Sequence, residues 1–184
     1  MPGHVYSRDG HPNADAVAEK CRALHGAERA AIAASGMGAM ALALVSQCQQ
    51  GAHLVLSNRL YGKSFTLLQA ETQRMGISSS IVDTCDLKAT AAAMTPRTKL
   101  LVVETITNPT LRVSDISALA GIAHDGGAKL LVDNTFASPV VCRPLELGAD
   151  LVMESLTKIM NGHSDAMLGL LCGRASAWDR VPAC

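Results

Sequence analysis

The chain has 184 residues, of which 48% are hydrophobic and 17% charged, and its formal net charge at pH 7 is zero. This length suits one domain with a short arm, and the hydrophobic fraction is large enough to bury a core. Because no excess of positive charge is available for a basic face, nucleic acid and anionic membranes are excluded as expected partners.

The first predicted element is a polar, turn-rich arm over residues 6–13. Asn13 is expected to cap a helix from Ala14 to about His25, which Gly26 ends. A second helix is expected over residues 37–48, with Gly51 after it. Helical patterns then alternate with short apolar runs. The helices are expected over 63–75, 86–94 and 114–124, and the strands over 53–57, 79–82, 99–104, 129–133, 150–154 and 166–172.

Strands made of continuous apolar residues and separated by helices predict a mostly parallel sheet covered on both faces, in an α/β doubly wound layout. Ligands bind to such sheets at the carboxyl ends of the strands. The residues that follow the strands are therefore the candidates for chemistry, and they lie in the segments 57–62, 104–109, 133–135 and 155–158.

These segments carry a lysine, a strand-end carboxylate, a tyrosine, an amide and two hydroxyls beside the lysine. Pyridoxal 5′-phosphate (PLP) requires such a set. It needs an amine to form an imine, a carboxylate to keep its pyridine nitrogen protonated, a flat group to stack on its ring, and donors for its phosphate. In Ser155-Leu156-Thr157-Lys158 the sequence predicts Lys158 as the Schiff-base lysine.

A candidate phosphate site lies in Ser35-Gly36-Met37-Gly38-Ala39-Met40. Glycine lets the backbone approach a ligand closely, and the N-terminus of the helix that follows offers unpaired N–H groups and a positive dipole end. A small-residue helix start is also a common packing feature, so the loop alone does not decide between these interpretations.

With these residues in place, the chain resembles the Cys/Met-metabolism PLP enzymes, a family that includes cystathionine γ-synthase, cystathionine lyases, methionine γ-lyase and O-acylhomoserine sulfhydrylases. The matching segments occur in order across nearly the whole chain. They are Tyr6-Ser7-Arg8, Ser35 to Ala39, Tyr61-Gly62, Glu104 to Pro109, Val132 to Phe136, and Ser155 to Lys158 followed by Asn161-Gly162-His163-Ser164-Asp165.

The resemblance implies a fold and a set of roles. The fold is an aspartate aminotransferase-like (fold type I) large domain with a mostly parallel seven-stranded sheet flanked by helices. Lys158 forms the internal aldimine and shuttles protons, Asp133 pairs with the pyridine nitrogen, and Tyr61 stacks on the ring and takes part in proton transfer. The remaining contacts are the N–H groups of Gly36 and Met37 and the hydroxyls of Ser155 and Thr157 at the phosphate, and Asn108 at the ring hydroxyl.

The resemblance also implies an assembly and a reaction. Tyr6 and Arg8 match residues that reach the PLP of a neighbouring subunit, which implies a homodimer or homotetramer. The implied reaction is elimination or replacement at Cβ or Cγ of substrates such as cystathionine or an O-acylhomoserine, in the methionine and cysteine metabolism of the cytoplasm. We expect cystathionine γ-synthase or γ-lyase activity in particular.

The chain departs from the family pattern in three places. His11 and Asn13 stand where the family usually has other residues, and Lys63-Ser64 follows Tyr61-Gly62 where many methionine γ-lyases have cysteine. The sequence also ends 26 positions after Lys158. The expected organisation is therefore an intersubunit arm over residues 1–13 and a PLP-binding large domain over 14–184, with no C-terminal small domain and none of its carboxylate-binding arginine.

Other functional sites have little support in the sequence. The cysteines form no Cys-x-x-Cys pair and the histidines lack metal-ligand spacing, so we expect no metal, and reduced thiols in a cytoplasmic protein. The N-terminus lacks a signal-peptide layout, and no apolar run reaches membrane-spanning length.

Two alternative functions stay open. The chain could bind PLP without completing a reaction, or it could be a nucleotide-binding α/β domain that uses the loop at Gly36 to Gly38, although no Gly-x-Gly-x-x-Gly fingerprint supports the latter. Single residues also have structural alternatives: Asn108 as a turn residue before Pro109, Ser155 as a backbone partner, and the arm as a disordered terminus.

Overall fold

The computed structural model describes residue 6 and residues 10–181. Its strands are β1 (Arg29–Ala33), β2 (His53–Ser57), β3 (Ser78–Val82), β4 (Thr98–Glu104), β5 (Lys129–Asp133), β6 (Leu151–Glu154) and β7 (Gly169–Gly173). Its α-helices are α1 (Pro12–His25), α2 (Gly36–Gln47), α3 (Gly62–Arg74), α4 (Leu87–Ala93), α5 (Ile116–Asp125) and α6 (Ser138–Val141), with 3₁₀ turns η1 (Pro144–Leu147) and η2 (Ala175–Ala177).

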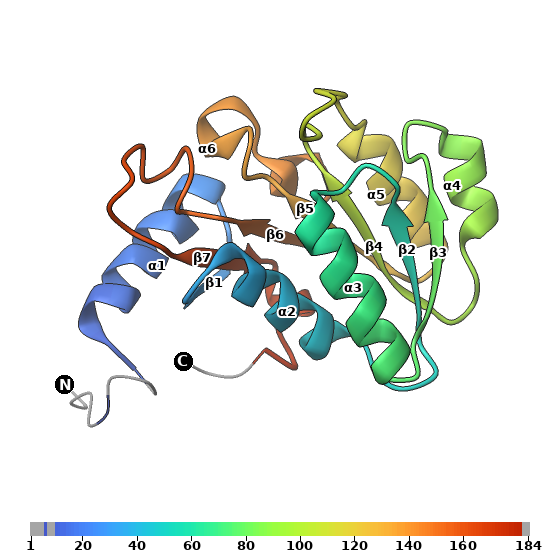
Figure 1. Ribbon diagram of the computed structural model, residues 1–184, viewed down its shortest axis with the longest axis horizontal. Coiled ribbons are helices and arrows are strands. Elements are labelled where there is room, and N and C mark those ends of the chain that lie inside the picture. The colour runs from blue at the N-terminus through green and yellow to red at the C-terminus, as the bar shows by residue number, and fades with distance from the viewer. Residues whose placement is uncertain (1–5, 7–9, 182–184) are drawn as a thin grey trace.

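The seven strands form one sheet in the order β1-β7-β6-β5-β4-β2-β3, which confirms the predicted mostly parallel, seven-stranded α/β layout (Figure 1). Strands β3, β2, β4, β5 and β6 run parallel to one another, whereas β7 is antiparallel to both β6 and β1. Because β1 is antiparallel to β7 and β7 is antiparallel to β6, β1 runs in the same direction as β6. The carboxyl end of β1 therefore lies at the same edge of the sheet as those of β2, β4, β5 and β6.

Alternate residues of each strand feed two separate cores, one on each face of the sheet. Leu54, Leu56 and Val102 pack with α2 and α3, through residues such as Leu44 and Leu68. Val55, Leu101, Val103, Leu130 and Val132 pack on the opposite face with residues of α5, including Leu119 and Ala123. The period-two alternation of a strand explains this division. Burial on both faces also explains why the central strands are apolar without interruption.

Local signals decide where several helices begin. The Oδ1 atom of Asp86 accepts the N–H of Ala89 at 3.0 Å, so Asp86 caps α4 and the helix begins one residue after the predicted start at 86. The predicted cap of α1 is wrong: the helix begins at Pro12, and His11, not Asn13, is the cap residue, with its Nδ1 accepting the N–H of Asn13 at 3.2 Å. Proline fits the first helical position because its missing N–H would have no helical partner there.

The observed strands differ from the predicted ones in two places. Strand β1 was not predicted, because Arg-Ala-Ala-Ile-Ala has a composition that favours a helix as much as a strand. The last strand begins at Gly169 and not at Ala166. The Thr157 hydroxyl bonds both the carbonyl and the N–H of Leu168, at 3.2 and 3.1 Å, and so occupies groups that the sheet would otherwise use.

Gly169 is required by a close approach between β7 and the turn before α2. A Cβ atom at this position would lie 2.0 Å from the carbonyl oxygen of Ser35 and 2.8 Å from the backbone nitrogen of Gly36. We expect Gly169→Ala to lower the free energy of unfolding by about 3 kcal/mol, since backbone atoms must shift. Urea denaturation measures the change.

The matched control is Gly121→Ala. Gly121 lies within α5 and a Cβ there meets nothing within 4 Å. This variant should gain about 0.5–1 kcal/mol from helix propensity. A Gly169→Ala protein as stable as the Gly121→Ala protein would contradict the steric argument.

Candidate functional site

A cavity of about 1150 Å³ opens at the carboxyl edge of the sheet and brings together nearly all of the predicted site residues. The loops after β1, β2, β4, β5 and β6 line it, as expected of a doubly wound sheet. The predicted residues on its wall are Gly36, Met37, Tyr61, Asn108, Asp133, Ser155, Thr157 and Lys158.

One end of the cavity is built from the start of α2 and the residue after β6. The Ser35 hydroxyl caps α2 by accepting the N–H of Gly38 at 3.1 Å. The N–H groups of Gly36 and Met37, at the first two helical positions, have no partner within the helix and are available to an anion. Ser155 lies directly against Gly36, since a Cβ on Gly36 would come within 2.7 Å of the Ser155 Cβ.

The Ser155 backbone is held in place from the neighbouring strand. Its N–H donates to the Thr135 hydroxyl at 2.9 Å, so the loops after β5 and β6 are joined at this point. The Thr157 hydroxyl is already bonded to the backbone of Leu168. Thr157 therefore lines the cavity while it also fixes the cavity wall.

Asp133 is the last residue of β5, and its side chain is almost fully buried against the cavity. Desolvation raises the pKa of its carboxyl to about 6, hydrogen bonds from Thr135 lower it, and the charge of Glu154 raises it further. The Oδ1 atom accepts the N–H of Thr135 at 3.0 Å. A buried carboxylate without a cationic partner is costly, so this position favours a positively charged or N–H-bearing ligand.

Lys158 lies in a tight turn after β6. Its N–H donates to the Ser155 carbonyl at 3.1 Å, and its own carbonyl accepts the N–H of Gly162 at 2.9 Å. Leu156, buried between these polar residues, anchors the turn in the core. Among the described residues that line the cavity, Lys158 carries the one primary amine.

The loop after Lys158 is held by Asn161. Its Nδ2 donates to the carbonyl of His163 at 2.6 Å and to Oδ1 of Asp165 at 2.8 Å. These bonds shape the cavity rim.

Glu104 is a cavity residue to which the sequence reasoning assigned no role. It is buried at the end of β4, directly beside Asp133 in the sheet register. Burial and the charge of Asp133 raise the pKa of Glu104 to about 7, while bonds from the N–H groups of Tyr61 and Asn108 lower it. Its position at the end of an apolar strand could have identified it from the sequence, because residues at the carboxyl ends of parallel strands lie at the edge of the sheet where ligands bind.

Of the two predicted arm contacts, only Tyr6 is described, and it does not line the cavity. Tyr6 is exposed and its carbonyl accepts the N–H of Gly10 at 3.2 Å. Arg8 lies outside the described residues.

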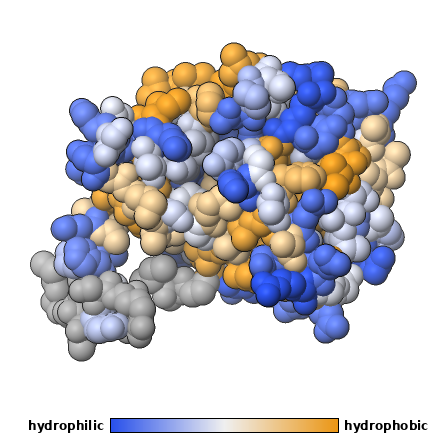
Figure 2. All heavy atoms as spheres, in the orientation of Figure 1, coloured by the Kyte–Doolittle hydropathy of each residue, from blue (hydrophilic) through white to orange (hydrophobic). Residues whose placement is uncertain are grey.

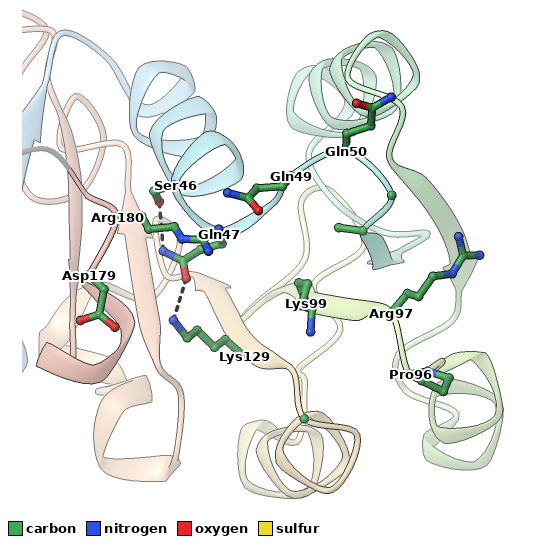
Figure 3. Close-up of a pocket in the computed structure, with 13 residues that line it drawn as sticks. Ser46, Gln47, Gln49, Gln50, Pro96, Arg97, Lys99, Lys129, Asp179 and Arg180 are labelled. Carbon is green, nitrogen blue, oxygen red and sulfur yellow. Dashed lines mark hydrogen bonds between the residues drawn. The ribbon is translucent and has the colours of Figure 1, made fainter.

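A second hollow, of about 580 Å³, lies at the opposite edge of the sheet (Figure 3). Lys99, Arg97 and Lys129 border it, and Lys129 donates to the Gln47 side chain at 2.9 Å. None of the predicted site residues lines it. The carboxyl-edge cavity is therefore the candidate site.

The part of the chain that the structure describes offers neither a metal site nor a membrane-spanning helix. No cluster of His, Cys, Asp and Glu side chains could hold a metal ion. No helix in the described ranges has both the length and the apolar character needed to cross a membrane. The cysteines described are free thiols, and burial raises the pKa of Cys21 to about 11 and that of Cys48 to about 12.

The residues of the cavity fit PLP. Gly36 and Met37, whose N–H groups have no partner within the helix, line the cavity beside Ser155, the buried carboxyl of Asp133 suits a pyridine N–H, and Lys158 lines the same space. Tyr61, at 45% exposed, offers a ring face that is not packed in the core.

Comparison with known proteins agrees with this fit. The model of the Cys/Met metabolism PLP-dependent enzyme family matches residues 1–182. The chain is 43% identical over 173 residues to an L-methionine gamma-lyase of Porphyromonas gingivalis, covering 94% of this chain and 43% of the relative. It is 43% identical over 169 residues to a cystathionine gamma-synthase of Mycobacterium bovis, covering 92% of this chain and 44% of the relative.

Solved structures also match the chain, in both fold and sequence. The crystal structure of metB from Corynebacterium glutamicum matches with a TM-score of 0.93 and 38% identity, over 97% of this chain and 46% of that one. A putative O-acetylhomoserine (thiol)-lyase (metY) from Campylobacter jejuni, solved with N′-pyridoxyl-lysine-5′-monophosphate, matches with a TM-score of 0.91 and 29% identity, over 97% and 44%. The chain thus spans less than half the length of the relatives it matches.

Proposed function

Because the chain belongs to the Cys/Met metabolism PLP-dependent enzyme family, we propose that it takes part in sulfur amino-acid metabolism by elimination or replacement at Cβ or Cγ of an amino-acid substrate. The observation that carries this proposal is the convergence of Lys158, Asp133, Tyr61 and the Gly36 turn on one cavity. Members of the family are PLP-dependent lyases and γ-synthases.

Each predicted residue has a position that supports its proposed role toward PLP. Lys158 would hold the cofactor, and the carboxylate of Asp133 would accept the pyridine N–H. The phosphate would lie at the N–H groups of Gly36 and Met37. Ser155 would contribute its hydroxyl, and Thr157 would do so by exchanging its bond to the Leu168 carbonyl for one to the phosphate. Tyr61 would stack on the ring, and Asn108 would contact the ring hydroxyl.

When bound, PLP supplies the electron sink that makes a substrate Cα–H acidic. The protein's part is to move protons and to hold groups in place. The Nζ of Lys158 would accept the Cα proton and return it, and the phenol of Tyr61 would act as a second proton carrier. The ionised carboxyl of Asp133 would keep its N–H donor protonated through a charge-assisted hydrogen bond.

For the substrate we propose cystathionine or an O-acylhomoserine. The names of the relatives, which include a methionine lyase and a cystathionine synthase, support this class of sulfur-containing or O-acylated amino acid. The presence of Lys63-Ser64 in place of cysteine after Tyr61-Gly62 favours γ-synthase or γ-lyase activity over methionine cleavage.

We also propose the organisation that the resemblance implied. Residues 1–13 would form an arm, although α1 already begins at Pro12, and residues 14–184 would form the PLP-binding domain. Tyr6 and Arg8 would reach the site of a neighbouring copy in a homodimer or homotetramer. Hydrophobic side chains gathered over α6 (Figure 2), where Val140 is 88% exposed, are consistent with a covered surface in such an assembly. A cytoplasmic location is proposed with it.

Spectroscopy with substrate assays tests the proposed function. Added PLP should give the absorption band at the edge of the visible that lysine-bound PLP produces, and borohydride should fix it on the peptide containing Lys158. Turnover should follow with cystathionine, or with homocysteine and O-succinylhomoserine. A protein without the band would contradict PLP binding, whereas a band without turnover would identify a chain that binds PLP but does not complete a reaction alone.

A further inference from the structure

Glu104 connects two loops that approach the cavity from different parts of the sheet. Its Oε1 atom accepts the backbone N–H of Tyr61, and its Oε2 atom accepts the backbone N–H of Asn108 at 3.1 Å. Tyr61 lies in the connection from β2 to α3, and Asn108 follows β4. One buried carboxylate therefore sets the position of both loops.

The start of α3 depends on this contact. Tyr61 is the N-cap residue of α3, and its side chain makes no capping hydrogen bond. Glu104 instead holds the backbone of Tyr61 from the adjacent strand, since β4 and β2 are neighbours in the sheet. At the other end of the carboxylate, Asn108 is held in the loop that also contains the hydrogen bond from the Thr107 N–H to the Arg112 carbonyl, at 2.9 Å.

Only the ionised form of Glu104 satisfies both donors fully. A carboxylate has two acceptor oxygens, whereas a protonated carboxyl carries an O–H that is a donor, as is the NH₂ group of glutamine. In the glutamine variant one of the two backbone N–H groups loses its acceptor, and in the protonated acid one of them faces a hydroxyl, which accepts more weakly than a carboxylate oxygen. A buried N–H that loses or weakens its hydrogen bond is unfavourable.

We propose that Glu104 is a positioning residue of the site, whose ionised carboxylate fixes the loops of Tyr61 and Asn108 relative to each other. The proposal rests on the proposed function in one respect, namely that Tyr61 and Asn108 contact the cofactor ring. Glu104 itself contacts the loops through their backbone, so it acts through those two residues and not on the substrate.

Burial and the nearby charge of Asp133 raise the pKa of Glu104 to about 7, so its ionisation changes with pH near neutrality. The titratable side chains described on the same cavity wall are Tyr61, Asp133, Lys158, His163 and Asp165. Of these, Asp133 on the neighbouring strand β5 raises the pKa of Glu104, which burial brings to about 7. A cationic or N–H-bearing partner for Asp133 would weaken this repulsion and keep Glu104 ionised.

Backbone amide chemical shifts test the proposal without any cofactor. In ¹H–¹⁵N spectra of the protein free of PLP, the Tyr61 and Asn108 amides should shift with pH and share one midpoint near 7. Glu104→Gln should remove both titrations, and the control Glu146→Gln, at an exposed position, should leave them unchanged. Amides that titrate as in the wild type in Glu104→Gln, or that have separate midpoints, would overturn the proposal.

Asp133→Asn covers the case in which Glu104→Gln fails to fold. Removing the neighbouring negative charge should move the common midpoint of the two amides to lower pH, and it should move both by the same amount. Amides that shift independently in this variant would also overturn the proposal. Because these spectra need no PLP, a wild-type protein that fails to bind PLP would contradict the proposed function and still leave this test readable.

The cofactor gives a second readout. We expect Glu104→Gln to raise the Kd for PLP about tenfold and to reduce the circular dichroism of the bound cofactor, because the stacking residue and the ring-hydroxyl residue are less well fixed. Glu146→Gln should keep the wild-type Kd and dichroism. A Glu104→Gln protein that matches the wild type in both would contradict the positioning role.

Discussion

Lys158→Ala should abolish the visible-edge absorption of the PLP-loaded protein and lower turnover by about 10³-fold or more. The physical reason is that the described cavity wall offers no other primary amine, so no group can take over the covalent attachment or accept the Cα proton. The cavity should keep its shape, since the turn at residue 158 is held by backbone bonds to Ser155 and Gly162.

The matched control is Lys63→Ala. Lys63 is an exposed residue in the first turn of α3 and does not line the cavity. It should retain the band, the borohydride adduct and the turnover of the wild type. Persistence of the band in Lys158→Ala, or a pyridoxyl adduct found on another peptide by mass spectrometry, would refute Lys158 as the attachment point.

Asp133→Asn should change stability and cofactor affinity in opposite directions. The pKa of Asp133 is raised from 3.8 to about 6 in the folded protein, mainly by desolvation. A carboxyl with a raised folded-state pKa retains its proton longer than in the unfolded chain. The contribution of Asp133 to stability is therefore most favourable below the unfolded value of 3.8 and is lost as the pH rises through the folded value of about 6. Asparagine does not ionise, so it avoids this loss of stability. The free energy of unfolding of the cofactor-free variant should therefore rise by about 1–3 kcal/mol at neutral pH.

The same substitution should weaken PLP binding by about 10–100-fold, because a neutral amide replaces a charge-assisted acceptor at the pyridine nitrogen. Denaturant unfolding across pH gives the first quantity, and absorbance titration with PLP gives the second. Asp125→Asn, at an exposed position at the end of α5, is the control for both. A variant that loses stability at neutral pH, or binds PLP as tightly as the wild type, would contradict the assignment of Asp133.

The cavity itself could be predicted from the sequence because a parallel sheet imposes a geometric rule. Continuous apolar strands are buried on both faces, so their polar residues can only follow at the strand ends. Asp133 and Lys158 lie at such ends, and each is next to a strand that the apolar pattern identifies. Tyr61 follows another predicted strand and the Gly36 turn opens a predicted helix, and the structure brings both to the same wall.

Features that depend on contacts between distant residues could not be predicted in this way. Strand β1 has an alanine-rich composition, and its antiparallel pairing with β7 decides its conformation. The Glu104 carboxylate meets the Tyr61 amide 43 positions away. The requirement for glycine at 169 comes from the Ser35 carbonyl across the sheet.

The sequence alone thus determined which of the predicted groups meet at the carboxyl edge of the sheet, because local patterning and strand ends are properties of short segments. The tertiary structure alone decided how those groups are held. The carboxylate of Glu104 that meets the Tyr61 amide and the glycine at 169 that allows close contact with the Ser35 backbone are relations between segments far apart in the chain, and only packing brings those segments together.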